Sequence, residues 1–502
     1  MAPSSDHPHP INSRKLPQPP HTMAGVAVVM VPLPAQGHLN QLLHFSRLIT
    51  SYHIPVHYVA ATTHLHQAKL RLHGWDPSTA ADSQLLHFHG FEIPHFPSPP
   101  PNPNSPCKFP SQLMPAMEAS ASYLRRHVAA LVGSLALRYR RVVVIHDSLM
   151  ASTIQDVFSA GNVESYIFQS VSAFSIYWYI ARTAGKQLTL GEYDDRVFLD
   201  DPPPLEVCFS AEFLKFAELQ YKFRHLASGF LYNTSRVVEG RFMELLEKET
   251  VNQKYWAVGP FNPVKLPSPP SPNTKPPQEH VKHRCIQWLD RHPQNSVIYV
   301  SFGTTVTLTN DQINQIATAL ENSGQRFVWV LREADKGDIF ENGTEVALPL
   351  MMLPKGFEDR VEGTGLVVKG WAPQLEILGH AAVGGFLSHC GWNSCVESMS
   401  MGVPMVAWPM HSDQPCNSLL VTKVLKIGLD VEARWSPAGA LCSGRVVEAA
   451  SIERAVRVLM DSEKGDGMRR RAAELGQAVR GSVEKGGVST AELDAFVSHI
   501  SR

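Results

Sequence analysis

The sequence has no excess of either charge, and this absence limits the kinds of partner the protein can have. Its 502 residues include 45 Lys and Arg against 46 Asp and Glu, and only 18% of the residues are charged. Proteins that bind nucleic acids or membrane surfaces usually carry a basic excess. We therefore expect a small-molecule partner, with no nucleic-acid or membrane partner.

Cysteine is scarce, and so are long apolar runs. The seven cysteines are scattered and form no C-x-x-C pair, which argues against a disulfide framework or a zinc ribbon. Residues 1–22 contain prolines and histidines but no apolar signal-peptide core. The apolar run from Ala24 is interrupted by Pro32 and Pro34, so it is too short to span a bilayer. We expect a disordered tail over 1–22 and a cytoplasmic protein with reduced thiols.

Short β-branched runs alternate with amphipathic segments along the whole chain. Val26–Val31 and 141–147 are examples in the first half, and 296–302 and 383–389 in the second. This alternation predicts an α/β protein with two doubly wound, Rossmann-like parallel-sheet domains. A dense run of prolines between Pro260 and Pro277 divides the halves and is typical of an extended linker. The predicted parts are a first domain over 23–260, a linker over 261–280, a second domain over 281–475 and C-terminal helices over 476–502.

His38 and Asp147 lie where two predicted strands end, which is where ligands bind in such sheets. His38 stands in a Pro- and Gly-containing loop at the start of a helix, whose dipole we expect to keep the imidazole neutral. Asp147 ends an apolar strand, where a carboxylate needs a partner. A carboxylate bonded to one ring nitrogen would prepare the other to accept a proton. Adjacent His146 should face the opposite side of the sheet. The alternative is that His38 only caps its helix.

The stretch from Trp371 to Gln414 has the composition of a nucleotide-sugar site. His389–Ser394 (HCGWNS) follows a strand and opens a helix, a favourable place for a phosphate. Asp413 and Gln414 offer an acceptor and an amide to sugar hydroxyls, and Glu397 offers an acceptor to a ribose diol. Trp371 provides a flat face for a base.

This stretch resembles the plant secondary-product motif of family 1 UDP-glycosyltransferases. It matches at W-A-P-Q, H-C-G-W-N-S, E-S and the final D-Q. P-x-P-A-Q-G-H near the start, C-x-x-W-L-D at Cys285–Asp290 and S-F-G-T at Ser301–Thr304 extend the resemblance over nearly the whole chain. The resemblance implies a GT-B fold, in which two domains face each other across a cleft and the last helices return to the first domain. It implies a UDP-sugar donor and a small hydroxylated acceptor. We expect no metal and no further cofactor, because the chain lacks D-x-D, and we expect a monomer.

The same resemblance implies a role for each matching residue. His38 would be the general base on the acceptor hydroxyl, and Asp147 its partner. Trp371 would stack on uracil, which Ala372 would contact through its backbone, while Gln374 and Glu397 hold the ribose. The diphosphate would be held by Thr304, His389, Asn393 and Ser394, and the sugar by Trp392, Asp413 and Gln414. A final Gln favours UDP-glucose in the family, whereas the departure from the usual A-E-Q ending at Ser412-Asp413-Gln414 leaves xylose open.

Within the family, the chain resembles the zeatin O-glucosyltransferases at VPLPAQGHLNQLLHFSRLI, at VVVIHDSLMAS and at Leu231–Gly240. This resemblance implies transfer of glucose, with inversion, to the side-chain hydroxyl of zeatin. A flavonoid, isoflavonoid or other small-phenol O-glucosyltransferase is the alternative, and a non-catalytic nucleotide-sugar binder is a third. An NAD(P)-dependent oxidoreductase is disfavoured because no G-x-G-x-x-G follows a strand. We expect the acceptor pocket in the first domain, bordered by Phe91–Pro106 with His95 and Phe96.

Overall fold

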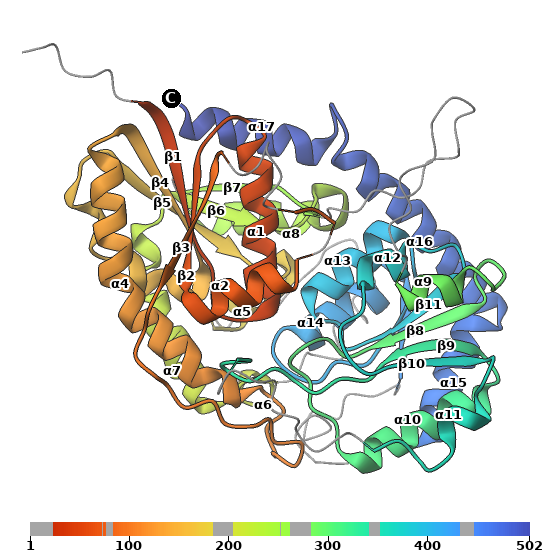
Figure 1. The fold of residues 1–502 in the computed structure, drawn as a ribbon. Helices are drawn as coiled ribbons and strands as arrows, with labels where there is room; N and C mark the ends of the chain where they lie inside the picture. The colour runs from red at the N-terminus through yellow and green to blue at the C-terminus, as the bar shows by residue number, and fades with distance from the viewer. Residues whose placement is uncertain are drawn as a thin grey trace, which may run out of the picture.

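The chain forms two lobes, each built on a parallel sheet (Figure 1). The structure, a computed structural model, describes residues 24–72, 74–76, 84–183, 204–250, 253–261, 283–340, 352–431 and 446–502. The tail predicted over 1–22 and nearly all of the predicted linker lie outside the described residues.

The first sheet has seven strands in the order β3-β2-β1-β4-β5-β6-β7. Its strands are β1 (Ala24–Val31), β2 (Val56–Ala61), β3 (Leu86–Phe91), β4 (Tyr139–Asp147), β5 (Val163–Gln169), β6 (Gly229–Tyr232) and β7 (Lys254–Ala257). The chain enters at β1, proceeds to the β3 edge and returns to the other side of β1. Val31 pairs with His146 in the adjacent strand, so the loops that leave β1 and β4 start side by side.

Helices cover both faces of this sheet. They are α1 (Gln36–Thr50), α2 (Thr62–Leu70), α4 (Met114–Ala136), α5 (Ala173–Thr183), α6 (Leu205–Cys208), α7 (Ala211–Tyr221) and α8 (Arg236–Glu249), with the short 3₁₀ segments η1 (Ser111–Leu113) and η2 (Ser148–Ile154). Side-chain alternation explains the two layers: Val28 and Met30 pack in one apolar cluster with α1, while Val29 and Val31 pack in another with α4.

The second sheet has six strands in the order β10-β9-β8-β11-β12-β13. They are β8 (Val297–Ser301), β9 (Arg326–Val330), β10 (Gly365–Val368), β11 (Val383–Ser388), β12 (Met405–Ala407) and β13 (Gly428–Asp430). Its helices are α9 (Arg284–Leu289), α10 (Asn310–Ser323), α11 (Phe357–Arg360), α12 (Gln374–Leu378), α13 (Trp392–Met401), α14 (Gln414–Leu419) and α15 (Ala449–Met460). Ser388 pairs with Ser301, so the loops after β8 and β11 also begin side by side.

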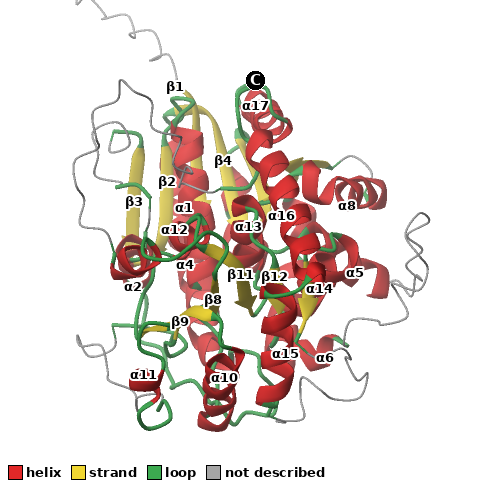
Figure 2. Cartoon of the chain, turned by 90° about the vertical axis from the view of Figure 1, so that its right-hand side faces the viewer, coloured by secondary structure: helices red, strands yellow, loops and turns green. Residues whose placement is uncertain are grey.

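The last two helices connect the lobes. From the second lobe, α16 (Glu463–Ser482) leads to α17 (Val488–Ile500), which lies over the first lobe (Figures 1 and 2). Phe496 of α17 is fully buried and packs against Trp256 of β7 and Tyr166 of β5. No helix in the described part of the chain is long and apolar enough to cross a membrane.

Candidate active site

A cavity of about 780 Å³ lies between the lobes, beyond the carboxyl ends of both sheets. It is lined by all the predicted site residues except Asp147, which stands directly behind His38: Thr304, Trp371, Ala372, Gln374, His389, Trp392, Asn393, Ser394, Glu397, Asp413, Gln414 and His38 itself. In each lobe these residues lie on loops and helices that follow the strands of the sheet. His38 of the first lobe therefore stands on one wall of the cavity, and the predicted donor-site residues of the second lobe stand on the facing wall.

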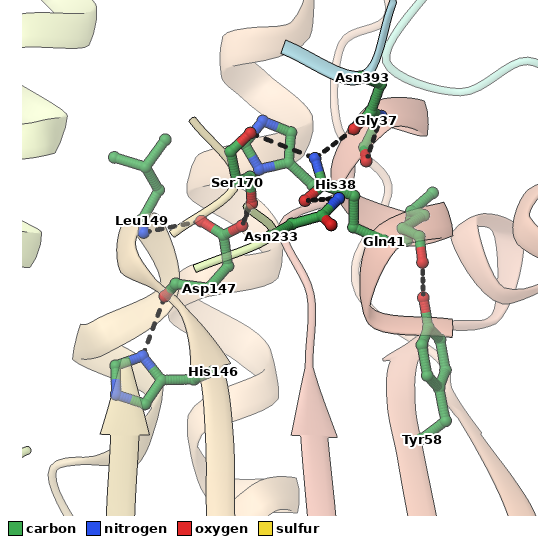
Figure 3. A network of polar contacts seen from close by, with 11 residues as sticks. Gly37, His38, Gln41, Tyr58, His146, Asp147, Leu149, Ser170, Asn233 and Asn393 are labelled. Atoms are coloured by element: carbon green, nitrogen blue, oxygen red, sulfur yellow. Dashed lines mark hydrogen bonds and ion pairs between the residues drawn. The ribbon is translucent and has the colours of Figure 1, made fainter. Parts of the chain in front are cut away.

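His38 and Asp147 are in direct contact. The His38 Nδ1 atom lies 2.7 Å from Asp147 Oδ2, and the carboxylate is fully buried. Asp147 also accepts hydrogen bonds from the Ser170 hydroxyl at 2.6 Å and from the Leu149 backbone N–H at 2.9 Å (Figure 3). With Nδ1 held by the carboxylate, Nε2 is the ring nitrogen that can receive a proton from a ligand in the cavity.

The electrostatics of this pair differ from the sequence-based expectation. Burial opposes ionisation of Asp147, but the neighbouring His38 and the hydrogen bonds outweigh it and lower the pKa of Asp147. Burial likewise tends to lower the pKa of His38, yet the Asp147 carboxylate raises it above its ordinary value, with a smaller contribution from Asp413. The prediction that the helix dipole keeps the imidazole neutral was therefore wrong in direction, because the Asp147 carboxylate in contact with the ring raises the pKa of His38. The result is a stronger base.

His146 is turned away from this contact, as strand alternation predicts. Its Nδ1 atom lies 2.9 Å from the Asp147 carbonyl oxygen, on the other side of the chain (Figure 3). Burial lowers the pKa of His146 to about 4, so this ring is neutral and does not line the cavity.

The start of α13 is arranged to receive an anion. No side chain caps the helix and no acidic residue lies in its first turn, so its first N–H groups remain available. His389 stands beside it, and its buried Nδ1 atom has no hydrogen-bond partner. A side chain at Gly303 or at Gly391 would clash with this ring, because a Cβ atom added at either position would lie 2.5 Å from His389 Nε2. Since burial lowers the pKa of His389 to about 4, this ring is neutral and one of its nitrogens can donate to a phosphate.

The residues predicted to hold the ribose are bonded to one another. Gln374 donates to Glu397 Oε2 at 2.8 Å and to the Ser394 hydroxyl at 3.0 Å, while Tyr299 donates to Gln374 Oε1 at 3.3 Å. Burial raises the pKa of Glu397 to about 7 although the bond from Gln374 opposes this shift. Trp371 is half-buried and exposes part of its ring to the cavity beside Ala372.

At the predicted sugar end, several polar groups already have partners. Gln414 Oε1 accepts from the Met410 and His411 backbone N–H groups at 2.8 and 3.1 Å, and its amide nitrogen lies 3.4 Å from both ring nitrogens of His411. Asp413 accepts from Asn417 at 2.7 Å, and burial raises the pKa of Asp413 to about 6.

Trp392 and Asn393 hold the two lobes together. The Trp392 indole donates to the Asn233 carbonyl oxygen at 2.9 Å, and Asn393 donates to the Gly37 carbonyl oxygen at 2.9 Å. Gln41 of α1 donates to Asn393 Oδ1 and accepts from Asn233 at 3.1 Å (Figure 3). Sequence reasoning did not find Gln41, Asn233 or Ser170. The only sequence signal concerned Gln41, which lies close to His38 along α1.

The apolar end of the cavity lies in the first lobe, as predicted, but with different walls. Its lining includes Leu33, Phe109, Leu113, Met117, Ile176, Tyr179, Phe209 and Phe213. The prediction that Phe91–Pro106 borders it was wrong. His95 and Phe96 line a separate, smaller cavity of about 300 Å³, because Ser98 and Phe96 pack against the loop after β9 and against His64 of α2.

The raised pKa of Glu397 leads to a prediction about nucleoside binding. A ribose diol donates to the ionised carboxylate, so we expect the affinity for uridine to rise between about pH 6 and pH 8, at most tenfold per pH unit, and then level off. Uridine avoids the phosphate ionisation near pH 6 that UDP would add. Calorimetric titration of uridine measures this slope, and Glu397→Gln should remove it. An equal slope in that variant would contradict the assignment of Glu397 to the ribose.

Comparison with known proteins identifies the class to which this fold and site belong. The family model for the glycosyltransferase N-terminal domain matches residues 24–263, and that for UDP-glucoronosyl and UDP-glucosyl transferase matches residues 251–436. In fold, the chain is similar to Phytolacca americana UGT2, solved with UDP-2fluoro-glucose and pterostilbene (TM-score 0.69, 26% identity, 95% of this chain and 100% of that one). The protein belongs to the plant family 1 UDP-glycosyltransferases and is a glycosyltransferase of the GT-B fold.

More similar relatives come from one branch of that family. The chain is 50% identical to zeatin O-glucosyltransferase of Phaseolus lunatus over 477 residues, which cover 95% of this chain and 97% of the relative. It is 48% identical to zeatin O-xylosyltransferase of Phaseolus vulgaris, covering 95% and 98%. It is 43% identical to cis-zeatin O-glucosyltransferase 1 of Zea mays, covering 96% and 99%.

Proposed function

We propose that the enzyme transfers glucose from UDP-glucose to the side-chain hydroxyl of zeatin, with inversion at the anomeric carbon. The observation that carries this proposal is the His38–Asp147 pair at the wall of a cavity shared by both lobes. A general base at this place serves proton removal from a hydroxyl, which a protein that only binds nucleotide sugars does not need.

The reaction divides between the two walls of the cavity. His38 Nε2 takes the proton of the acceptor hydroxyl while its oxygen attacks the anomeric carbon and the bond to UDP breaks, so that an α-linked donor gives a β-glucoside. Asp147 stabilises the imidazolium formed in this step. The charge that develops on the diphosphate lies at the start of α13, near His389 at the cavity wall. The hydrogen bonds of Trp392 and Asn393 to the first lobe hold the two walls together around the reactants.

The relatives and the cavity support zeatin as the acceptor. The three relatives compared above are named for O-glycosylation of zeatin or cis-zeatin. The apolar end of the cavity contains aromatic rings suited to a flat heteroaromatic ring, such as Phe109, Phe209 and Phe213. Flavonoids and other small phenols remain the alternative acceptors. Because one relative is a xylosyltransferase, the sugar also needs a direct test.

The test is to incubate the enzyme with UDP-glucose or UDP-xylose and a panel of trans-zeatin, cis-zeatin, dihydrozeatin and flavonoids. We expect UDP release together with a zeatin product heavier by one hexose, and kcat/KM higher for UDP-glucose than for UDP-xylose. Transfer only to phenols would favour the alternative acceptors. Tight UDP binding without any transfer would contradict the proposal.

Three further expectations belong to this proposal and rest on the sequence: a monomer, a cytoplasmic location and activity without a metal ion. Within the described ranges, no group of three or more His, Cys, Asp or Glu side chains is placed to hold a metal. Size measurement of the purified enzyme, and assays with and without a chelator, test the first and third.

A further inference from the structure

The loop after β9 crosses from the second lobe to the first. Residues 331–340 follow the strand and contact α2 and its surroundings. Thr63 donates to Asp338 at 2.6 Å, and His64 lies 2.9 Å from the Gly337 carbonyl oxygen. Phe340 stacks on His66 with ring centres 4.3 Å apart. The loop is therefore part of the contact between the lobes, outside the motif that identifies the family.

Asp335 is the centre of this loop, and all its polar groups are engaged. Its carboxylate accepts from Arg332 of the same lobe and from Arg71 of the other lobe, both at 2.6 Å. Its backbone N–H donates to the Thr304 carbonyl oxygen at 2.7 Å, and its carbonyl oxygen accepts from Gln112 of η1 at 3.1 Å. The side chain is only 5% exposed. One buried residue thus joins the first lobe to a residue of the predicted diphosphate site.

The two arginines that Asp335 holds lie against the predicted uracil platform. The guanidinium carbons of Arg71 and Arg332 are 5.2 and 5.7 Å from the centre of the Trp371 ring, within the range of cation–π attraction. Arg332 also lines the cavity, and its buried Nη1 atom has no hydrogen-bond partner.

Electrostatics explains why this cluster needs Asp335. Two guanidinium groups close to one indole repel each other, and a buried carboxylate between them compensates that repulsion. Arg71 belongs to the first lobe and can reach Trp371 and Asp335 only while the lobes are together. The shape of the uracil platform and the closure of the lobes therefore depend on the same carboxylate.

We propose that Asp335 is a positioning residue that fixes Arg332 and Arg71 against Trp371, so that tight donor binding depends on lobe closure. This inference rests on the proposed function, in which UDP-glucose lies on Trp371. Asp335 is not among the residues that line the cavity. Asp335 acts on donor binding by holding Arg332 and Arg71 against Trp371 and by its backbone hydrogen bond to Thr304.

The test uses two variants of the full chain, Asp335→Asn and Arg71→Gln. Each should raise the KM for UDP-glucose and the Kd for UDP roughly tenfold, the scale of a typical coupling between sites. The KM for the acceptor should change less than about twofold, a split that general destabilisation does not produce. Arg71→Gln keeps Asp335 paired with Arg332, so it decides the question if Asp335→Asn does not fold.

Asp338→Asn is the matched control. It removes a carboxylate three residues further along the same loop that is also bonded to the first lobe, at Thr63, but that contacts neither Arg332 nor Thr304. We expect it to leave both donor constants near the wild-type values. An unchanged donor KM in Arg71→Gln, or an equal rise in Asp338→Asn, would overturn the proposal. Absence of turnover by the wild-type enzyme would instead count against the proposed function.

Discussion

Replacing His38 by alanine is expected to lower kcat by about 10²–10⁴-fold, the usual contribution of a general base. An alcohol hydroxyl is too weak an acid to ionise before it attacks, so loss of Nε2 removes the group that accepts its proton. Steady-state rates with UDP-glucose and zeatin measure the loss. Binding of UDP should be unchanged, since His38 lies on the opposite wall.

A matched control for this substitution is His95→Ala. His95 lies in the first lobe but lines the smaller cavity, so its removal should leave kcat within about twofold of wild type. If His38→Ala kept more than a tenth of the wild-type kcat, another group would be the base.

The second large effect is expected for Asp147→Asn, which keeps the size of the side chain but removes its charge. We expect kcat to fall about a hundredfold or more, because a neutral amide stabilises the imidazolium poorly and can select the wrong tautomer. The pH–rate profile gives a second readout. Asp147 raises the pKa of His38 against the effect of burial, so without the carboxylate that pKa falls.

The sign of the pH effect follows from the role of the base. His38 must be neutral to act, so wild-type activity declines as the pH falls through the raised pKa of His38. In Asp147→Asn this decline should begin at a lower pH. Ser170→Ala, which removes one hydrogen bond at 2.6 Å from the carboxylate but leaves its charge, should displace the profile less. A decline at an unchanged or higher pH in Asp147→Asn would contradict the account.

The sequence predicted well which residues of the candidate site lie at the ends of strands. His38 and Asp147 are far apart in the chain, but both follow buried β-branched runs, and the register of β1 with β4 brings them together. The same reasoning applies to Thr304 and His389 after β8 and β11. Parallel strands have one carboxyl edge, so a residue's place at a strand end determines its place in the site.

The features of the site that the sequence did not reveal arise where segments far apart in the chain pack together. Such contacts leave no recognisable pattern in the sequence. Asp335 lies in an irregular loop, and its partners Arg71 and Gln112 come from the other lobe. The walls of the apolar end are contributed by α5, α7 and the residues around η1, whose apolar periodicity only indicates burial. The direction of the His38 pKa required the 2.7 Å contact itself.

A crystal structure with UDP and zeatin bound tests the central claim most directly. The account predicts the uracil ring on Trp371, the diphosphate at the start of α13, and the zeatin side-chain hydroxyl within about 3 Å of His38 Nε2. A hydroxyl bound elsewhere in the cavity while His38 contacts only protein atoms, or UDP bound away from Trp371, would contradict it.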